Sequence, residues 1–174
     1  MKYPIGIQTF ETLREGGWHY VDKTALVYQL ANAGKYFFLS RPRRFGKSVL
    51  LSTLEAYFEG KKELFQGLAM EQLEKDWTAY PVLHLDFNTG NFKSGENLEE
   101  ILDYQLKKWE TRYQVTEKSS AVSLRFSKVI EAAYEQTGHP AVILVDEYDK
   151  PLLQNIGNES LQDELRGIMK AFYS

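Results

Sequence analysis

Short apolar runs alternate along the chain with longer segments in which apolar residues recur at helical spacing. The runs at 36–39, 81–87 and 141–145 are too short for helices and favour buried strands. The run at 141–145 is wholly apolar, as expected of a parallel strand that helices cover on both faces. Strands separated by helical segments need crossover connections, so the pattern predicts an α/β fold with a parallel sheet.

The helical segments have recognisable ends. The first begins where Asp22 and Thr24 can cap it, presents Leu26, Val27, Leu30 and Ala31 on one face, and stops at Gly34. Further helices are predicted at 47–58, at about 96–113 and 121–135, and at 161–173. The first twenty residues predict no regular element. Because no repeat or linker-like tract divides the sequence, we expect one domain over residues 1–174.

The run at 36–39 leads directly into a loop that ends Gly46-Lys47-Ser48, where a helix is predicted to begin. A strand, a tight loop and a helix in this order let backbone N–H groups and a helix N-terminus cradle a polyphosphate. Gly46 would let the backbone approach, Lys47 would neutralise the β and γ oxygens, and the Ser48 hydroxyl would ligate Mg²⁺. The residues predicted to bind the nucleotide are Arg41, Pro42, Arg43, Arg44, Phe45, Gly46, Lys47, Ser48 and Val49.

The run at 141–145 delivers Asp146 and Glu147 to its carboxyl end, the edge of an open parallel sheet at which ligands bind. In the functional interpretation Asp146 holds Mg²⁺, usually through water, and Glu147 polarises the attacking water. In the competing interpretation, which Asp149 supports by adding a third carboxylate, this is a solvated acidic turn.

The phosphate loop is rich in arginine, which suits bidentate phosphate contact. Arg41, Arg43 and Arg44 could serve the bound nucleotide, the nucleotide of a neighbouring subunit, or nucleic acid. Alternatively, Arg43 and Arg44 pair with acidic residues such as Glu147 or Asp149. An oligomer is compatible with the second of these roles.

Composition narrows the class of protein. The net charge of −3 arises from 21 basic and 24 acidic residues, so no overall field draws the chain to nucleic acid or membranes. The absence of cysteine excludes disulfides, thiolate metal sites and cysteine nucleophiles. No apolar run has the length of a signal peptide or of a membrane span, and we therefore expect a soluble, cytoplasmic protein.

Four blocks of the sequence together resemble the bacterial AAA-ATPase-like family: 20–24, 38–48, 54–60 and 145–152. The resemblance implies a three-layer P-loop NTPase-like parallel sheet flanked by helices, with ATP and Mg²⁺ as cofactors. It implies that Lys47 and Glu147 are catalytic and that Ser48 and Asp146 are metal ligands. In this family the ATPase region is often followed by a PD-(D/E)XK nuclease-like domain, which we expect as a partner in a longer protein.

Two features depart from the general P-loop pattern. Arg41 occupies the position of its first glycine, which makes a nucleotide-gated module with little hydrolysis, or a nucleic-acid-binding module, the alternatives to an ATPase. A sensor strand that normally inserts between the phosphate-loop strand and the Asp-Glu strand is also missing, so we expect the chain to be truncated before it. The block at 22–24 either contacts the base or ribose or only caps a helix, and we favour the cap.

Overall fold

The computed structural model describes residues 2–40, 45–88, 90–117 and 119–173. They form two compact units, an N-terminal unit, Met1–Val82, and a C-terminal unit, Leu83–Ser174. Among the described residues no helix is both long and apolar enough to cross a membrane.

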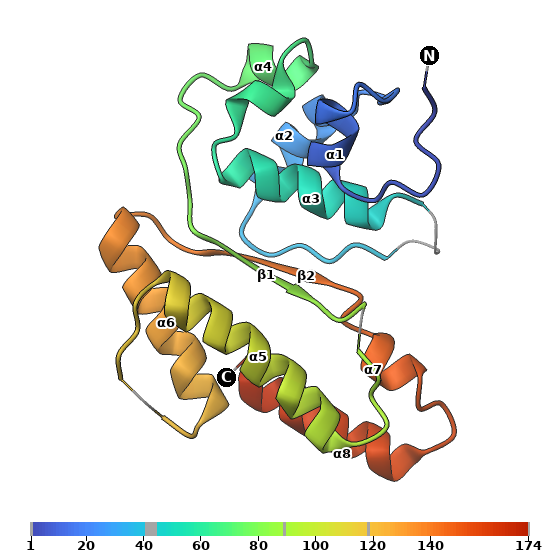
Figure 1. Ribbon diagram of the computed structural model, residues 1–174, viewed down its shortest axis with the longest axis vertical. Coiled ribbons are helices and arrows are strands. Elements are labelled where there is room, and N and C mark those ends of the chain that lie inside the picture. Colours follow the sequence, from blue (N-terminus) through green and yellow to red (C-terminus); the bar gives the residue numbers. More distant parts are fainter. Residues whose placement is uncertain (1, 41–44, 89, 118, 174) are drawn as a thin grey trace. The chain divides into compact units, whose positions relative to one another are not determined.

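The N-terminal unit is helical (Figure 1). Its elements are α1 (Phe10–Glu15), α2 (Thr24–Ala33), α3 (Lys47–Phe58), the 3-10 helix η1 (Lys62–Phe65) and α4 (Ala69–Leu73). Aromatic side chains dominate its core: the rings of Phe10 and Phe65 lie 4.9 Å apart, and Trp77 packs 5.2 Å from Phe65. Such ring pairs add specific geometry to the burial of apolar area, and they join α1, η1 and the segment before the first strand.

The C-terminal unit contains a parallel sheet of two strands, β1 (Val82–Asp86) and β2 (Val142–Asp146) (Figure 1). Helices α5 (Gly95–Arg112) and α6 (Val122–Thr137) connect the strands, and α7 (Lys150–Leu153) and α8 (Glu159–Phe172) follow. This is the βαβ connection that the sequence predicts. The α/β class, the parallel sheet and its flanking helices are therefore confirmed, whereas the three-layer arrangement remains a prediction.

The core of this unit lies between the sheet and its long helices. Leu83, Leu85 and Phe87 alternate along β1 and its end, and they pack with buried residues of α5, α6 and α8. The stacked rings of Phe126 and Phe172, 4.6 Å apart, join α6 to α8. Period-two alternation on the strand and heptad-like burial on α5 thus converge on one apolar layer.

An ion-pair cluster also joins α5 to α6. The Arg125 guanidinium donates to both carboxylate oxygens of Glu110, at 2.6 and 2.8 Å, and to Asp103 at 2.6 Å. These contacts hold the pKa of Glu110 below its usual range, although burial opposes the shift. The sequence offers no signal for this cluster because its partners come from separate helices.

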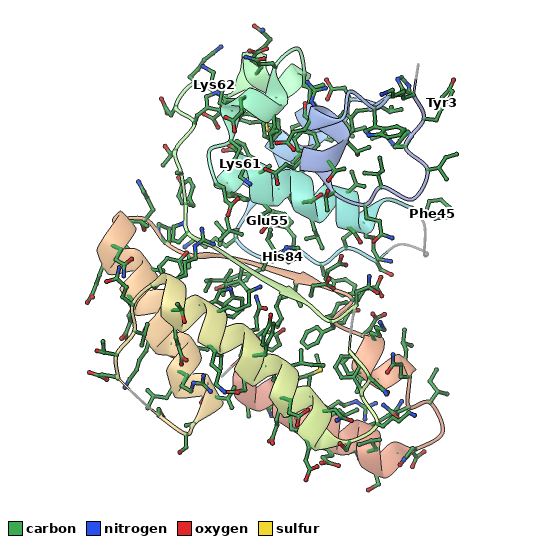
Figure 2. All side chains as sticks on the ribbon, viewed as in Figure 1. Tyr3, Phe45, Glu55, Lys61, Lys62 and His84 are labelled. Carbon is green, nitrogen blue, oxygen red and sulfur yellow. The ribbon has the colours of Figure 1, made fainter. Side chains whose placement is uncertain are left out.

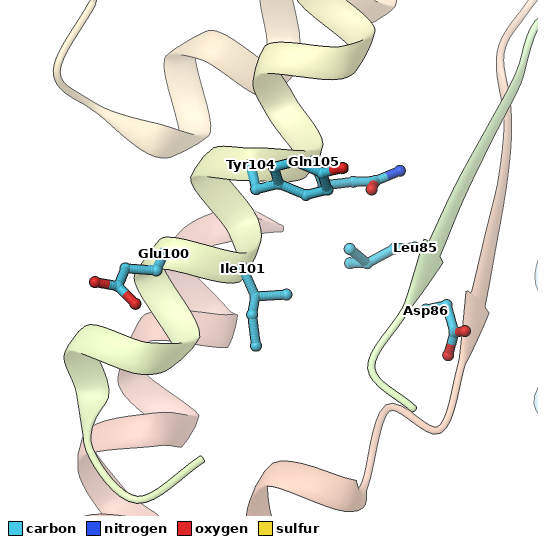
Figure 3. Close-up of a pocket in the computed structure, with 6 residues that line it drawn as sticks. All are labelled: Leu85, Asp86, Glu100, Ile101, Tyr104 and Gln105. Carbon is cyan, nitrogen blue, oxygen red and sulfur yellow. The ribbon is translucent and has the colours of Figure 1, made fainter. Parts of the chain in front are cut away.

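One backbone group at the outer edge of β1 bonds to a side chain of α5. Phe87 N–H donates to the carbonyl of Asp146 at 3.2 Å, so alternate backbone groups of β1 face β2 and the intervening ones face away. The outward carbonyl of His84 accepts from the Gln105 amide at 2.9 Å. A shallow groove of about 220 Å³ runs beside this contact, lined by Leu85, Asp86, Glu100, Ile101, Tyr104 and Gln105 (Figure 3). A side chain thus satisfies part of an edge that could otherwise pair with another strand.

The prediction of a strand at 36–39 is wrong. Tyr36, Phe37, Phe38 and Leu39 have no regular secondary structure and are 94, 53, 70 and 42% exposed. A strand exists only when a neighbour completes its hydrogen bonds, and the sheet formed by the described residues consists of β1 and β2. The apolar run therefore indicates a segment suited to a strand, not a strand that is paired here.

Two smaller predictions also fail. The first twenty residues contain α1, a helix too short to show a full period, in which Phe10 and Leu13 are buried. On α2, Val27 is buried as predicted, but Leu26 is exposed because the buried face centres on Thr24 and Val27.

Candidate functional site

The phosphate-loop residues that the structure describes lie at the start of α3. Gly46 has φ 74° and ψ 25°, a left-handed conformation that glycine adopts without cost. Its carbonyl accepts the Leu50 N–H at 3.0 Å and so begins the helix. The N–H groups of Lys47, Ser48 and Val49 occupy the first turn, in which amides lack intrahelical acceptors, and the N-cap residue, Gly46, has no side chain that could cap them. The arrangement suits an anion.

The next turn of α3 is fixed to the N-terminal segment. Ser52 Oγ accepts the Phe10 N–H at 2.9 Å and donates to the Val49 carbonyl at 3.0 Å. Thr53 Oγ1 donates to the same carbonyl at 2.7 Å. Burial raises the pKa of the Tyr20 hydroxyl, and its hydrogen bond with Thr53 partly offsets the shift. The second turn of α3 is therefore held by the backbone of Phe10 and by the side chain of Tyr20.

The block at 22–24 caps helices. One carboxylate oxygen of Asp22 accepts from the N–H and the hydroxyl of Thr24, at 2.8 and 2.7 Å. The other accepts from the Ala69 N–H, at 2.8 Å, where α4 begins. Thr24 Oγ1 in turn accepts the Met70 N–H at 3.0 Å. The two side chains therefore fasten the N-terminus of α2 to that of α4, and Lys23 between them is exposed.

The second part of the candidate site lies at the carboxyl end of β2. Asp146 is buried, and one of its carboxylate oxygens accepts the Glu147 N–H at 2.9 Å. Glu147 has φ 52°, a left-handed conformation that is rare for a residue with a side chain. Its carbonyl accepts the Lys150 N–H at 2.9 Å, which closes a turn directly before α7. The Asp146 side chain is buried and the Glu147 backbone is strained, and both observations argue against an ordinary solvated acidic turn.

Asn88 and Lys150 also meet at this edge, and the prediction from sequence overlooked them. The Lys150 ammonium donates to the backbone carbonyl of Asn88, which follows β1. Asp86, at the end of β1, accepts the Asn88 N–H at 2.7 Å. Lys150 lies in the block 145–152, but its position four residues after Asp146 gives no sign of which strand end it contacts.

The predicted site residues fall in both units. Lys47, Ser48 and Val49 belong to the N-terminal unit. The exposed Phe45 before them is labelled in Figure 2. Asp146 and Glu147 belong to the C-terminal unit. The convergence of these two groups on one nucleotide stays a prediction. The residues Arg41, Pro42, Arg43 and Arg44 lie outside the described residues, and so do the proposed pairings of Arg43 and Arg44 with Glu147 or Asp149.

The donor types present fit Mg²⁺ better than a transition metal. Ser48 and Asp146 offer hydroxyl and carboxylate oxygens, and Mg²⁺ is usually held by one or two such groups together with phosphates and water. In the described part of the chain, no group of three or more His, Cys, Asp or Glu side chains is arranged to hold a metal ion. A dedicated protein cage for a metal is therefore not found within that part.

Comparison with known proteins identifies a relative and a family for this chain. A protein from Azotobacter chroococcum mcd 1, described as "Uncharacterized protein in vnfD 5'region", is 40% identical over 175 residues. The match covers 99% of this chain and 34% of that protein, so the chain spans about a third of the length of this relative. No solved structure matches the chain.

A family model described as "Predicted AAA-ATPase" matches residues 4–174, a range that contains both parts of the candidate site. Membership of this family indicates nucleotide binding. With nearly the whole sequence matched, the chain belongs to the predicted AAA-ATPase family.

Proposed function

We propose that this chain binds ATP with Mg²⁺ and hydrolyses it, and that the two parts of the candidate site act on the same nucleotide. The observation that carries the proposal is the local geometry at the start of α3 and at the end of β2. A left-handed Gly46 opens α3 beside Lys47, and a buried Asp146 precedes a strained Glu147 at the end of a parallel strand.

The residues at the start of α3 would bind the triphosphate. The first-turn amides at 47–49 donate to phosphate oxygens, and the helix dipole favours their negative charge. The Lys47 ammonium neutralises the β and γ phosphates. The arginines at positions 41, 43 and 44 and the remaining loop residues, Pro42 and Phe45, complete the predicted loop around the nucleotide.

Ser48 at the start of α3 and two residues at the end of β2 would support the chemistry. The Ser48 hydroxyl and the Asp146 carboxylate hold Mg²⁺, whose charge stabilises the phosphate oxygens when it is bound. The Glu147 carboxylate orients a water molecule and accepts its proton. The water oxygen then bonds to the γ-phosphorus while the bond from that phosphorus to the bridging oxygen breaks, which yields ADP and phosphate.

Two substitutions test the proposal. Lys47→Ala removes the phosphate cation, so we expect it to weaken ATP binding strongly, whereas Lys62→Ala, an exposed lysine of the same unit, should leave binding unchanged. Glu147→Gln should retain ATP and lose turnover by about 10²–10⁴-fold. Glu99→Gln on the exposed face of α5 is its matched control. Unchanged ATP binding in Lys47→Ala would contradict the proposed site.

The nucleotide-gated module is the second candidate, and the arginine at the first glycine position of the loop is the observation that favours it. Tight Mg²⁺-dependent ATP binding without phosphate release would support this alternative. Binding of nucleic acid through the arginine-rich loop predicts instead an affinity that falls steeply with salt. Competition by ATP would then show that the same loop serves both ligands.

The relative from Azotobacter is about three times longer than the matched region, so the chain corresponds to one part of that protein. We propose that in such a longer protein ATP hydrolysis drives or licenses a further domain. A nuclease-like domain is the candidate that the family resemblance suggests.

A further inference from the structure

The turn that carries Glu147 is held in a conformation that its own sequence disfavours. A left-handed backbone is disfavoured for a residue with a side chain and persists only where the surroundings fix it. Two contacts hold the turn, from Glu147 N–H to the Asp146 carboxylate and from Lys150 N–H to the Glu147 carbonyl. Asp146 ends β2, and its carbonyl accepts the Phe87 N–H at 3.2 Å, so the sheet holds the start of the turn, whereas the contact of the Lys150 N–H is internal to the turn.

The far end of the turn is tied to the neighbouring strand by the side chain of Lys150. Its ammonium donates to the backbone carbonyl of Asn88 and lies 3.4 Å from the Asn88 side-chain oxygen. Asn88 lies two residues after the end of β1, and its own N–H donates to the Asp86 carboxylate. Lys150 therefore joins the turn after β2 to the end of the neighbouring strand, at a separation of 62 residues.

Further side chains of the same segment strengthen this connection. Gln154 accepts the Phe92 N–H at 3.1 Å, and Asn155 donates to the Phe92 carbonyl at 2.7 Å. Asn155 also donates to the carbonyl of Pro151 in α7, at 2.8 Å. The β1–α5 loop is thus bound at both of its ends by the segment that begins at Lys150.

The loop itself is a firm anchor. Phe92 is fully buried and packs 6.0 Å from the ring of Phe87, the residue next to Asn88. A Cβ added at Gly90 would lie 2.1 Å from the Phe92 ring, so the backbone passes directly over that ring. Because the loop is bound to the core, a bond from Lys150 to it transmits the position of the core to the Glu147 turn.

We propose that Lys150 is a positioning residue, which through Asn88 fixes the strained Glu147 turn to the end of β1 and so holds the Glu147 carboxylate where water is activated. The inference rests on the proposed function of Glu147. Lys150 is assigned no contact with nucleotide. Its effect should therefore fall on turnover and leave ATP affinity largely unchanged.

The test compares Lys150→Met, which keeps a side chain of similar length but removes the hydrogen-bond donor, with Lys150→Arg, which keeps a donor. Lys93→Met is the matched control, an exposed lysine of the same loop. Each variant of the full protein is assayed for kcat, for ATP Kd, for thermal midpoint, and for hydrogen exchange of the amides at 147–150. Displacement of a catalytic group by about 1 Å can cost two orders of magnitude, so we expect kcat in Lys150→Met to fall roughly 10–100-fold.

In the expected result, ATP Kd in Lys150→Met stays within about 3-fold of the wild-type value, the amides at 147–150 exchange faster, and Lys150→Arg restores most of kcat. Lys93→Met should match the wild type in every assay. Unchanged kcat or unchanged exchange in Lys150→Met overturns the proposal. The proposal is also overturned if Lys150→Met lowers ATP affinity, kcat and thermal midpoint together and Lys150→Arg restores none of them. Such a result marks a purely structural role.

The exchange measurement also separates this proposal from the proposed function. If the wild-type protein releases no phosphate, the hydrolytic function fails and the positioning role fails with it, whatever the exchange shows. If the wild type hydrolyses ATP but exchange at 147–150 is the same in Lys150→Met, the ATPase assignment stands and the positioning role alone is wrong.

Discussion

Asp22→Ala removes the side chain that joins α2 to α4. The carboxylate accepts from Thr24 through its N–H and hydroxyl and from the Ala69 N–H, each at 2.7 or 2.8 Å. The variant leaves the first amides of two helices without their side-chain acceptor. Because Asp22 is exposed, water can reach those amides, so the loss is that of helix caps and not of buried polar groups.

The expected size follows from that count. Removal of one cap costs about 0.5–2 kcal/mol, and Asp22 serves two helix starts, so we expect a loss of about 2 kcal/mol in the free energy of unfolding. For a chain of this length 1 kcal/mol corresponds to about 2–4 °C, which gives a fall of about 4–8 °C in the thermal midpoint. The measurement is thermal and urea unfolding of the wild type, Asp22→Ala and Lys23→Ala.

Lys23→Ala is the matched control because the side chain of this exposed neighbour makes no capping hydrogen bond at the start of α2. It should unfold with the wild type. The same variants distinguish a cap from a contact with the ribose or base. A cap predicts that Asp22→Ala, studied well below its midpoint, binds ATP with a Kd within about 3-fold of the wild-type value. A wild-type midpoint in Asp22→Ala, or a large loss of ATP affinity without loss of stability, would refute the reasoning.

Further predictions concern acid stability, the α5–α6 cluster and the phosphate loop. Burial raises the pKa of Asp22, but hydrogen bonds from Thr24 and Ala69 and the charge of Arg14 outweigh it and lower the pKa overall. The stabilisation is therefore present above the unfolded pKa of about 4 and is lost as pH falls through the folded value, so Asp22→Asn should flatten the acid limb of a stability–pH curve. Arg125→Met removes the bidentate partner of Glu110 and one partner of Asp103, which keeps Lys107, and should cost roughly 2 kcal/mol in urea unfolding. Arg125→Lys should recover less than half because lysine cannot make the bidentate contact. Gly46→Ala forces a side chain to φ 74° and should weaken ATP binding and cost about 1 kcal/mol in stability; equal ATP affinity in this variant would show that the left-handed conformation is not required.

Local pattern was sufficient for much of the fold. The apolar runs before Phe87 and Asp146 predict β1 and β2, because a short run ended by polar residues has few alternatives as a buried strand. Helix α3 begins at Lys47, as predicted. Gly46 precedes the helix in a left-handed conformation, which glycine adopts at low cost. The long helices α5 and α6 end near their predicted boundaries for similar local reasons.

Pairing across the sequence could not be predicted in the same way. The segment 36–39 has the composition of a strand, but a strand also needs a neighbour, and the sequence of the segment does not contain that information. The cluster around Arg125 and the contact of Lys150 with Asn88 have the same limitation. Their donors and acceptors lie 15 to 62 residues apart, and only the folded chain shows which of many polar side chains meet.

The candidate site was predicted as residue types and positions, and the roles of these residues stay predictions. The structure adds the local geometry, a left-handed Gly46 before α3 and an Asp146 carboxylate that accepts the N–H of a left-handed Glu147. What the pattern did not reveal is the strain at Glu147, since any residue can follow a strand and a left-handed conformation leaves no mark in a sequence that lacks glycine there. The residues that support such a conformation are equally hidden until the fold places them.

The central claim is that Lys47 and Asp146 act on one Mg²⁺–ATP, and a double-mutant cycle on ATP affinity tests it most directly. The Kd is measured by titration calorimetry in Mg²⁺ for the wild type, Lys47→Ala, Asp146→Asn and the double variant. If both side chains hold the same complex, the double variant should lose less free energy of binding than the sum of the single losses, by more than about 0.5 kcal/mol. Losses that add within that margin, or a wild-type affinity in Asp146→Asn, would contradict the claim that the two groups meet at one nucleotide.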